Sequence, residues 1–375
     1  MSNKAILVGV RLYNDKTDSA ERSIEELERL AETAGLEVVG TVVQQKDRPD
    51  SATYIGRGKC SELREFCENN DVDIAVFDDE LSGSQMKNIE EIMDVAILDR
   101  TLLVLDIFAS RAKSAEGRLQ VELAQLQYRL PRLSGMGSSL SRLGGGIGTR
   151  GPGETKLETD KRHINRRIKA IKEKLEEVSK RREQTRNRRK KDGMPTVALL
   201  GYTNAGKSTL LNKLCGSDIY AEDKLFATLD TSVRKMKPTS EDRIPAEIEI
   251  LFIDTVGFIR KLPHSLVDAF KSTLEESVNA DLILNVVDAG DSEAEEHIRV
   301  TEEIISSLGM DSKPMFLVLN KADTLASGTD SPSFEIEHYK KASGMPVYYV
   351  SAKTGKGISQ LKRACFEFFK SVKRI

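Results

Sequence analysis

Residues 196–214 read TVALLGYTNAGKSTLLNKL, in which an apolar run, a glycine loop and an amphipathic run follow one another. This order predicts a strand, a loop and a helix, and the loop carries the pattern G-x-x-x-x-G-K-S. Gly201 and Gly206 let the backbone curl so that successive N–H groups point at phosphate oxygens. Lys207 supplies a cation for the β- and γ-phosphates, and the Ser208 hydroxyl is a ligand for Mg²⁺. The candidate phosphate-binding residues are Gly201, Tyr202, Thr203, Asn204, Ala205, Gly206, Lys207, Ser208 and Thr209.

A second motif follows the apolar run EIEILFID, which ends at Asp254 and continues as Thr255, Val256 and Gly257. A carboxylate at the end of this predicted strand would hold Mg²⁺ through water. The N–H of Gly257 would contact the γ-phosphate, so that loss of this phosphate frees the following loop. The sequence thus predicts a pocket that distinguishes a nucleoside triphosphate from a diphosphate.

Two further motifs address the base. The Asp323 carboxylate can accept hydrogen bonds from both N1–H and the exocyclic amine of guanine, whereas adenine lacks this donor pair. The segment after VYYVS fits a backbone donor to guanine O6. All the motifs stand at the carboxyl ends of predicted strands, where α/β sheets bind ligands. They predict a GTPase that binds GTP, GDP and Mg²⁺, with these base-side residues: Asn320, Lys321, Ala322, Asp323, Ser351, Ala352 and Lys353.

The stretch between the phosphate loop and Asp254 contains Phe226, Ala227, Thr228, Leu229 and Asp230. We expect the Thr228 hydroxyl to join Ser208 and Asp254 as a Mg²⁺ ligand when the γ-phosphate is present. Thr231 and Ser232 are rival candidates for that role.

The predicted catalytic residues are Lys207, Thr228 and Gly257. Small GTPases often carry a glutamine directly after the glycine that corresponds to Gly257, and this glutamine orients the attacking water. In this chain the position is Phe258, whose side chain cannot hydrogen-bond to water. We therefore expect slow basal hydrolysis, roughly 10⁻⁴ to 10⁻² s⁻¹, and stimulation by a partner. A polar group from another loop is the open alternative.

The chain is long enough for several domains, and its patterns change along its length. Alternating strand and helix patterns in 1–100 predict a small α/β domain with a parallel sheet. Leucines from Leu119 to Leu130 and apolar residues from Ile164 to Val178 recur at coiled-coil spacing, which predicts an antiparallel helical hairpin in 101–192. The α/β rhythm returns in 193–375, the predicted P-loop GTPase domain, behind a linker over 179–193.

A second glycine-rich stretch, GGGIGTRGPGETKLETD, covers residues 144–160 and contains G-x-G-x-x-G. A dinucleotide-binding loop must follow a strand directly, and the preceding SSLSRLGG has no strand pattern. We expect 131–157 to form a long loop between the hairpin helices. It is either an RNA-contacting loop or a disordered connector. The candidate contacts in the first case are Arg132, Arg142, Arg150 and Lys156.

Charge and composition point to a polyanionic partner. The formal net charge is −2, yet residues 161–191 contain fifteen Lys/Arg against four Glu, a local charge of +11. A basic run of this kind favours nucleic acid, although a solvated helix face is the plain alternative. No apolar run approaches a membrane span, and the four cysteines form no zinc or disulfide spacing. We expect a cytoplasmic protein, monomeric in solution.

Several stretches together are similar to the HflX family of ribosome-associated GTPases in the Obg-HflX group. They include GYTNAGKSTL, LFATLD and DTVGFIRKLPHSLVDAFKSTLEE in the GTPase part, and YIGRGK and GGGIGTRGPGETKLETDKR upstream. The resemblance implies binding to the large ribosomal subunit and its rRNA, dissociation of ribosomes into subunits under stress, and release on GTP hydrolysis. It also implies that FATLD holds the switch threonine, although the family typically continues with Pro-Thr where this chain has Thr231-Ser232.

Two other functions stay open at this point. An RNA helicase or chaperone would use the nucleotide on isolated RNA, but the chain shows no separate set of helicase motifs. A scaffold that retains a nucleotide site without turnover is disfavoured by intact Lys207, Ser208 and Asp254.

Overall fold

The computed structural model places the chain in two compact units. One comprises Met1–Glu176 together with Lys261–Ala269, and the other comprises Glu177–Arg260 together with Phe270–Ile375. The residues that the structure describes are 3–14, 19–142, 156–191, 193–216, 225–226, 232–238, 242–245, 248–261, 276–325 and 344–372. None of the described helices has the length and apolar character needed to cross a membrane.

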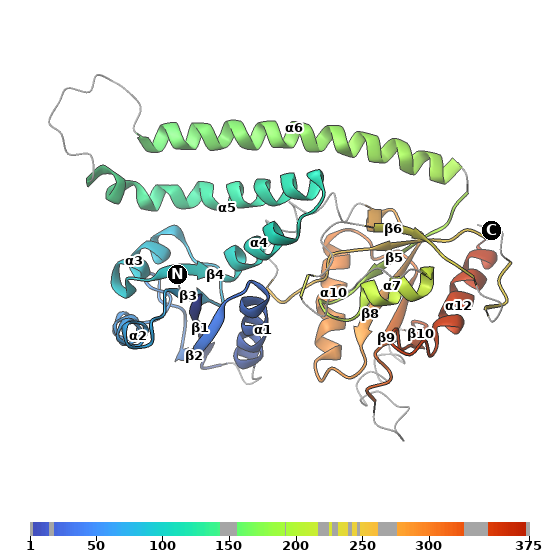
Figure 1. The fold of residues 1–375 in the computed structure, drawn as a ribbon, viewed down its shortest axis with the longest axis horizontal. Helices are drawn as coiled ribbons and strands as arrows, with labels where there is room; N and C mark the ends of the chain where they lie inside the picture. The colour runs from blue at the N-terminus through green and yellow to red at the C-terminus, as the bar shows by residue number, and fades with distance from the viewer. Residues whose placement is uncertain are drawn as a thin grey trace. The chain divides into compact units, whose positions relative to one another are not determined.

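The first unit contains a four-stranded parallel sheet of order β2-β1-β3-β4 (Figure 1). In β1, the adjacent residues Ile6, Leu7 and Val8 are all buried, so both faces of this strand are covered. This explains why the sequence of β1 is a continuous apolar run. The predicted α/β rhythm of this region is therefore confirmed. The elements are β1 (Lys4–Leu12), α1 (Ser19–Thr33), β2 (Glu37–Lys46), α2 (Arg57–Asn70), β3 (Ile74–Phe77), α3 (Gly83–Met93) and β4 (Ala96–Asp99).

A buried ionic cluster lies at the carboxyl end of this sheet. The Arg100 guanidinium, 1% exposed, pairs with Asp78 at 2.6 Å and with Glu26 at 3.0 Å. Burial raises the pKa of Asp78, but Arg100 and Lys261 outweigh it, so that the pKa stays below its usual value. The cluster fixes α1, β3 and α4 (Arg100–Arg111) to one another.

The helical middle region consists of α5 (Ala115–Arg142) and α6 (Lys156–Lys191). Up to Glu176, α6 runs antiparallel to α5 (Figure 1). Arg167 donates from Nε and one terminal nitrogen to the two carboxylate oxygens of Glu122, at 2.6 and 2.7 Å. Leu123 and Ile171 of the predicted apolar seams are buried, in agreement with the predicted hairpin.

Two predictions about this region are wrong. The loop predicted over 131–157 is helical at both ends, because α5 continues through Pro131 to Arg142 and α6 begins at Lys156. The Arg132 guanidinium bonds to the Tyr128 and Leu81 carbonyls and to Glu80, and these contacts stabilise the helix past the proline. The expected linker over 179–193 is helical as far as Lys191. Residues 143–155, including Arg150, lie outside the described residues.

The second unit contains a six-stranded sheet of order β10-β9-β8-β5-β7-β6, parallel except for β6. Helices α7 and α12 pack on one face, and α10 packs on the other through Ala294 and Ile298. The carboxyl ends of the parallel strands meet at one edge, where the motif residues stand. The elements are β5 (Thr196–Leu200), α7 (Lys207–Cys215), β6 (Ser232–Lys235), β7 (Leu251–Asp254), β8 (Leu282–Asp288), α10 (Ala294–Ser307), β9 (Met315–Asn320), β10 (Val347–Tyr349) and α12 (Ile358–Ser371).

The buried cluster of the first unit yields a stability prediction. Arg100→Met removes the buried cation that pairs with both Asp78 and Glu26, although Lys261 still pairs with Asp78, and we expect a loss of about 3–5 kcal/mol in the free energy of unfolding. Urea titration measures it. Arg299→Met, in an exposed pair with Glu296 and Glu303, is the control and should lose less than about 1 kcal/mol. Equal losses of unfolding free energy in the two variants would contradict a stabilising role for the buried ion pairs of Arg100.

Candidate guanine-nucleotide site

The loop between β5 and α7 has the backbone geometry that its glycines predict. Gly201 has φ 144°, and a Cβ there would lie 2.1 Å from the Val286 carbonyl oxygen. Gly206 has φ 83° and caps the N-terminus of α7. Only glycine fits these two positions. The loop leads directly into the N-terminus of α7, whose positive end favours an anion there.

Lys207 lies inside this loop and is 6% exposed. Its Nζ donates to the Gly201 carbonyl at 3.1 Å and to the Tyr202 carbonyl at 2.6 Å. Burial lowers the pKa of Lys207 to about 8, against the opposing effect of the nearby Asp254 carboxylate. A negatively charged phosphate bound beside Lys207 would offset the cost of burying this ammonium.

Two of the predicted Mg²⁺ ligands lie together. The Ser208 hydroxyl donates to an Asp254 carboxylate oxygen at 2.8 Å. A hydroxyl and a buried carboxylate this close supply hard oxygen donors, which suit Mg²⁺. The predicted third ligand, Thr228, lies outside the described residues, as do Ala227, Leu229 and Asp230. Phe226 is described and buried, with φ 55°.

The turn after β7 is fixed against the phosphate loop. Thr255 Oγ1 donates to the Leu199 carbonyl at 2.7 Å. A Cβ on Gly257 would lie 3.0 Å from Lys207 Nζ, so the Gly257 backbone stands beside the lysine expected to hold the phosphates. The Phe258 side chain is fully buried. The position directly after Gly257, where small GTPases often carry glutamine, therefore holds a buried apolar side chain.

The base-side motifs come together at the ends of β9 and β10. Asn320 Nδ2 donates to the Ala205 carbonyl at 2.8 Å, and its Oδ1 accepts from the Ala352 N–H at 3.0 Å. Its side chain therefore joins the phosphate loop to the loop after β10, a role that the sequence did not reveal. The Ala322 N–H donates to the Val350 carbonyl at 3.0 Å, and Lys321 pairs with Asp288 at 2.8 Å.

Asp323, the predicted guanine acceptor, is exposed at this edge. A hydrogen bond from the Ser351 side chain holds the pKa of Asp323 below its usual value, and Lys353 and Lys321 act in the same direction. Ser351 itself is fully buried and also accepts from the Thr354 N–H. The carboxylate is thus kept ionised, as an acceptor of two guanine N–H groups must be.

Sequence reasoning missed a group of side chains beside the phosphate loop. Tyr202 was predicted only as a loop residue, yet its ring stacks on His297 of α10. Arg260 and Glu293 belong to the same group. No spacing links these positions, because they come from separate loops and a helix.

Comparison with known proteins agrees with this geometry. The chain matches families described as the N-terminal region of GTP-binding GTPases (residues 21–109), their middle region (111–189) and 50S ribosome-binding GTPase (196–321). It is 52% identical over 361 residues to GTPase HflX of Caldanaerobacter subterraneus subsp. tengcongensis, covering 96% of this chain and 79% of that protein. The chain belongs to the HflX GTPase family. The predicted resemblance is therefore confirmed.

One more relative and one solved structure support the same assignment. GTPase HflX of Escherichia coli strain K12 is 41% identical over 364 residues, covering 97% of this chain and 82% of that protein. The crystal structure of the SsGBP and GDP complex aligns with a TM-score of 0.52 at 25% identity and covers 99% of both chains. This HflX-family chain is thus a guanine-nucleotide-binding GTP hydrolase.

Guanine selectivity can be tested at Asp323. Asp323→Asn replaces one acceptor of two N–H groups by an amide that accepts one and donates one. We expect GTP affinity to fall by roughly 10- to 200-fold and affinity for xanthosine triphosphate to rise, because xanthine presents a carbonyl in place of the amine. Equilibrium titration with both nucleotides measures the change. Asp311→Asn, at an exposed position of the same unit, is the control. Unchanged GTP preference in Asp323→Asn would remove Asp323 from the base pocket.

The pKa of Lys207 predicts proton uptake on binding. Because the pKa of Lys207 is about 8, a large fraction of the protein molecules carry a neutral Lys207 at pH 8.5. A bound phosphate raises this pKa again, so that Lys207 takes up a proton. We expect GDP binding at pH 8.5 to take up roughly half a proton more in the wild type than in Lys207→Arg, whose guanidinium stays charged. Calorimetry in buffers of different ionisation enthalpy measures the difference. Equal uptake in both proteins would show that Lys207 is fully charged before binding.

Proposed function

We propose that this HflX-family GTPase binds the large ribosomal subunit and promotes dissociation of ribosomes into subunits, with GTP hydrolysis controlling its release. Mg²⁺ is the proposed metal, held by Ser208, Asp254 and Thr228. The proposed place of action is the cytoplasm, where the ribosomes are.

The observation that carries this proposal is the cationic surface of α6. The helix is 36 residues long, and its charge is predominantly positive. rRNA presents a dense array of phosphates, and neutralising them releases counterions, which gives strong and salt-dependent binding. The description of the matching family as 50S ribosome-binding GTPase supports the same partner. Exposed cations along the described part of the helix include Arg166, Lys169, Lys172, Lys174, Arg181 and Arg188.

The nucleotide bound at the site would control the affinity for the ribosome. A ligand shifts a conformational equilibrium only by its differential affinity for the two states. Here the γ-phosphate is the group that reaches Gly257, directly before the segment that leaves the second unit at Arg260. GTP therefore favours one arrangement of this segment and GDP another, and ribosome affinity follows the nucleotide. Because Phe258 is buried, slow basal turnover remains our expectation, with the ribosome as stimulator.

Sedimentation of ribosomes with the full chain tests the proposal. We expect the chain to accompany large subunits with GTP or a non-hydrolysable analogue, to increase the free-subunit fraction, and to leave with GDP. Equal association with GDP and the analogue would contradict nucleotide control. Unwinding of a free RNA duplex without any effect on ribosomes would favour the helicase alternative.

The α6 surface has its own prediction. Replacing Arg166, Lys169 and Lys172 by Gln should weaken large-subunit binding and reduce the slope of log affinity against log salt concentration by about one for each lost phosphate contact. Neutralising Lys213, Lys356 and Lys370, exposed cations of the second unit, is the control. Binding and salt slope equal to those of the wild type in the α6 variant would remove the helix from the RNA interface.

A further inference from the structure

The segment from Gly257 to Arg260 is hydrogen-bonded to the phosphate loop by its backbone. The Thr203 N–H donates to the Phe258 carbonyl at 2.8 Å, and the Phe258 N–H donates to the Gly201 carbonyl at 3.1 Å. A Cβ on Gly257 would lie 2.8 Å from Thr203 Cα, so the two backbones are in close contact. A γ-phosphate that binds the Gly257 N–H must enter between these segments.

A tyrosine side chain adds a third contact to this pair. The Tyr202 hydroxyl accepts the Arg260 N–H at 2.7 Å. The Tyr202 ring is 5% exposed and stacks on His297, with centroids 3.8 Å apart and planes at 15°. Because stacking on His297 fixes the orientation of the ring, the Tyr202 hydroxyl is held in position to accept the hydrogen bond from the Arg260 N–H.

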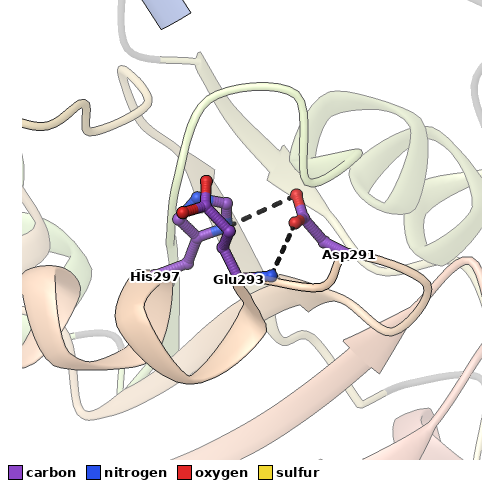
Figure 2. Close-up of side chains that lie close together, drawn as sticks. All are labelled: Asp291, Glu293 and His297. Carbon is purple, nitrogen blue, oxygen red and sulfur yellow. Dashed lines mark hydrogen bonds and ion pairs between the residues drawn. The ribbon is translucent and has the colours of Figure 1, made fainter. Parts of the chain in front are cut away.

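The Arg260 side chain is held as well. Its guanidinium donates to Glu293 Oε1 at 2.5 Å, and both side chains are 12% exposed. Asp291 accepts the Glu293 N–H at 2.9 Å and faces His297 Nδ1 at 3.6 Å (Figure 2). Asp291, Glu293 and His297 could together ligate a cation, but the Arg260 guanidinium already neutralises Glu293. The five side chains Tyr202, Arg260, Asp291, Glu293 and His297 are called the Tyr202–Arg260 network below.

We propose that the Tyr202–Arg260 network positions the segment 257–260 against the phosphate loop and thereby lowers the affinity for GTP relative to GDP. Tyr202, Arg260 and Glu293 are positioning residues, since they act through Gly257 rather than on the phosphates. The network stabilises the arrangement in which Thr203 and Phe258 bond to each other. GDP leaves that arrangement intact, whereas GTP must displace it to reach the Gly257 N–H. The inference concerns nucleotide binding alone and does not depend on the ribosomal partner.

The test compares two affinities in each variant of the full chain. Tyr202→Phe removes the hydroxyl acceptor but keeps the ring for His297, and Glu293→Gln removes the charge that holds Arg260. In each, we expect the affinity for a non-hydrolysable GTP analogue to rise about three- to tenfold relative to GDP, the range of one lost hydrogen bond. KM for GTP should fall with kcat changed less. Glu303→Gln, in an exposed pair with Arg299 on α10, is the matched control and should leave the ratio unchanged.

A charge exchange gives an independent check. Arg260→Glu should raise the ratio of analogue to GDP affinity, and adding Glu293→Arg should return it toward the wild-type value. A ratio unchanged in both Tyr202→Phe and Glu293→Gln would overturn the proposal. So would a ratio shifted toward GDP, or a parallel fall in both affinities, which marks a purely structural role.

Discussion

The nucleotide site depends on one side-chain amide, that of Asn320. It donates to the Ala205 carbonyl in the phosphate loop and accepts from the Ala352 N–H in the loop after β10, and it is 1% exposed. A buried polar group that loses its partner costs about 1–3 kcal/mol, so both loops are stabilised in one arrangement. The part of the pocket that holds phosphates and the part that reads the base are therefore a single unit, set at the carboxyl edge of the sheet.

Most of the fold could be predicted from the sequence, because its strands are buried on both faces and its helices are amphipathic. The run AILVGV lies within β1, and the glycine loop lies between β5 and α7, as expected. The errors concern 131–142 and 179–191, which are helical. Proline, glycine and polar residues lower helix propensity, but the contacts of Arg132 with Glu80 and Leu81 stabilise α5 beyond Pro131. Tertiary contacts of this kind leave no local sequence signal.

In the nucleotide site, too, residues with a local sequence signal could be predicted and residues that act through tertiary contacts could not. Gly201 and Gly206 could be found because their backbone conformations exclude other residues, and Ser208 and Asp254 because the strand ends place them. The contact of Asn320 with Ala205 joins residues 115 positions apart, and that of Tyr202 with Arg260 joins residues 58 apart. No spacing rule covers such pairs, since they depend on how loops from different strands approach each other.

Amide hydrogen exchange in Asn320→Ala tests the central role of this side chain. Asn285→Ala on the neighbouring strand β8 is the matched control, because within the described part of the chain its fully buried amide atoms have no hydrogen-bond partner. We expect Asn320→Ala to lose protection in 201–209 and 350–356 together and to bind GDP at least about tenfold more weakly. Wild-type GDP affinity, or loss of protection in only one of the two loops, would contradict a pocket held together by Asn320.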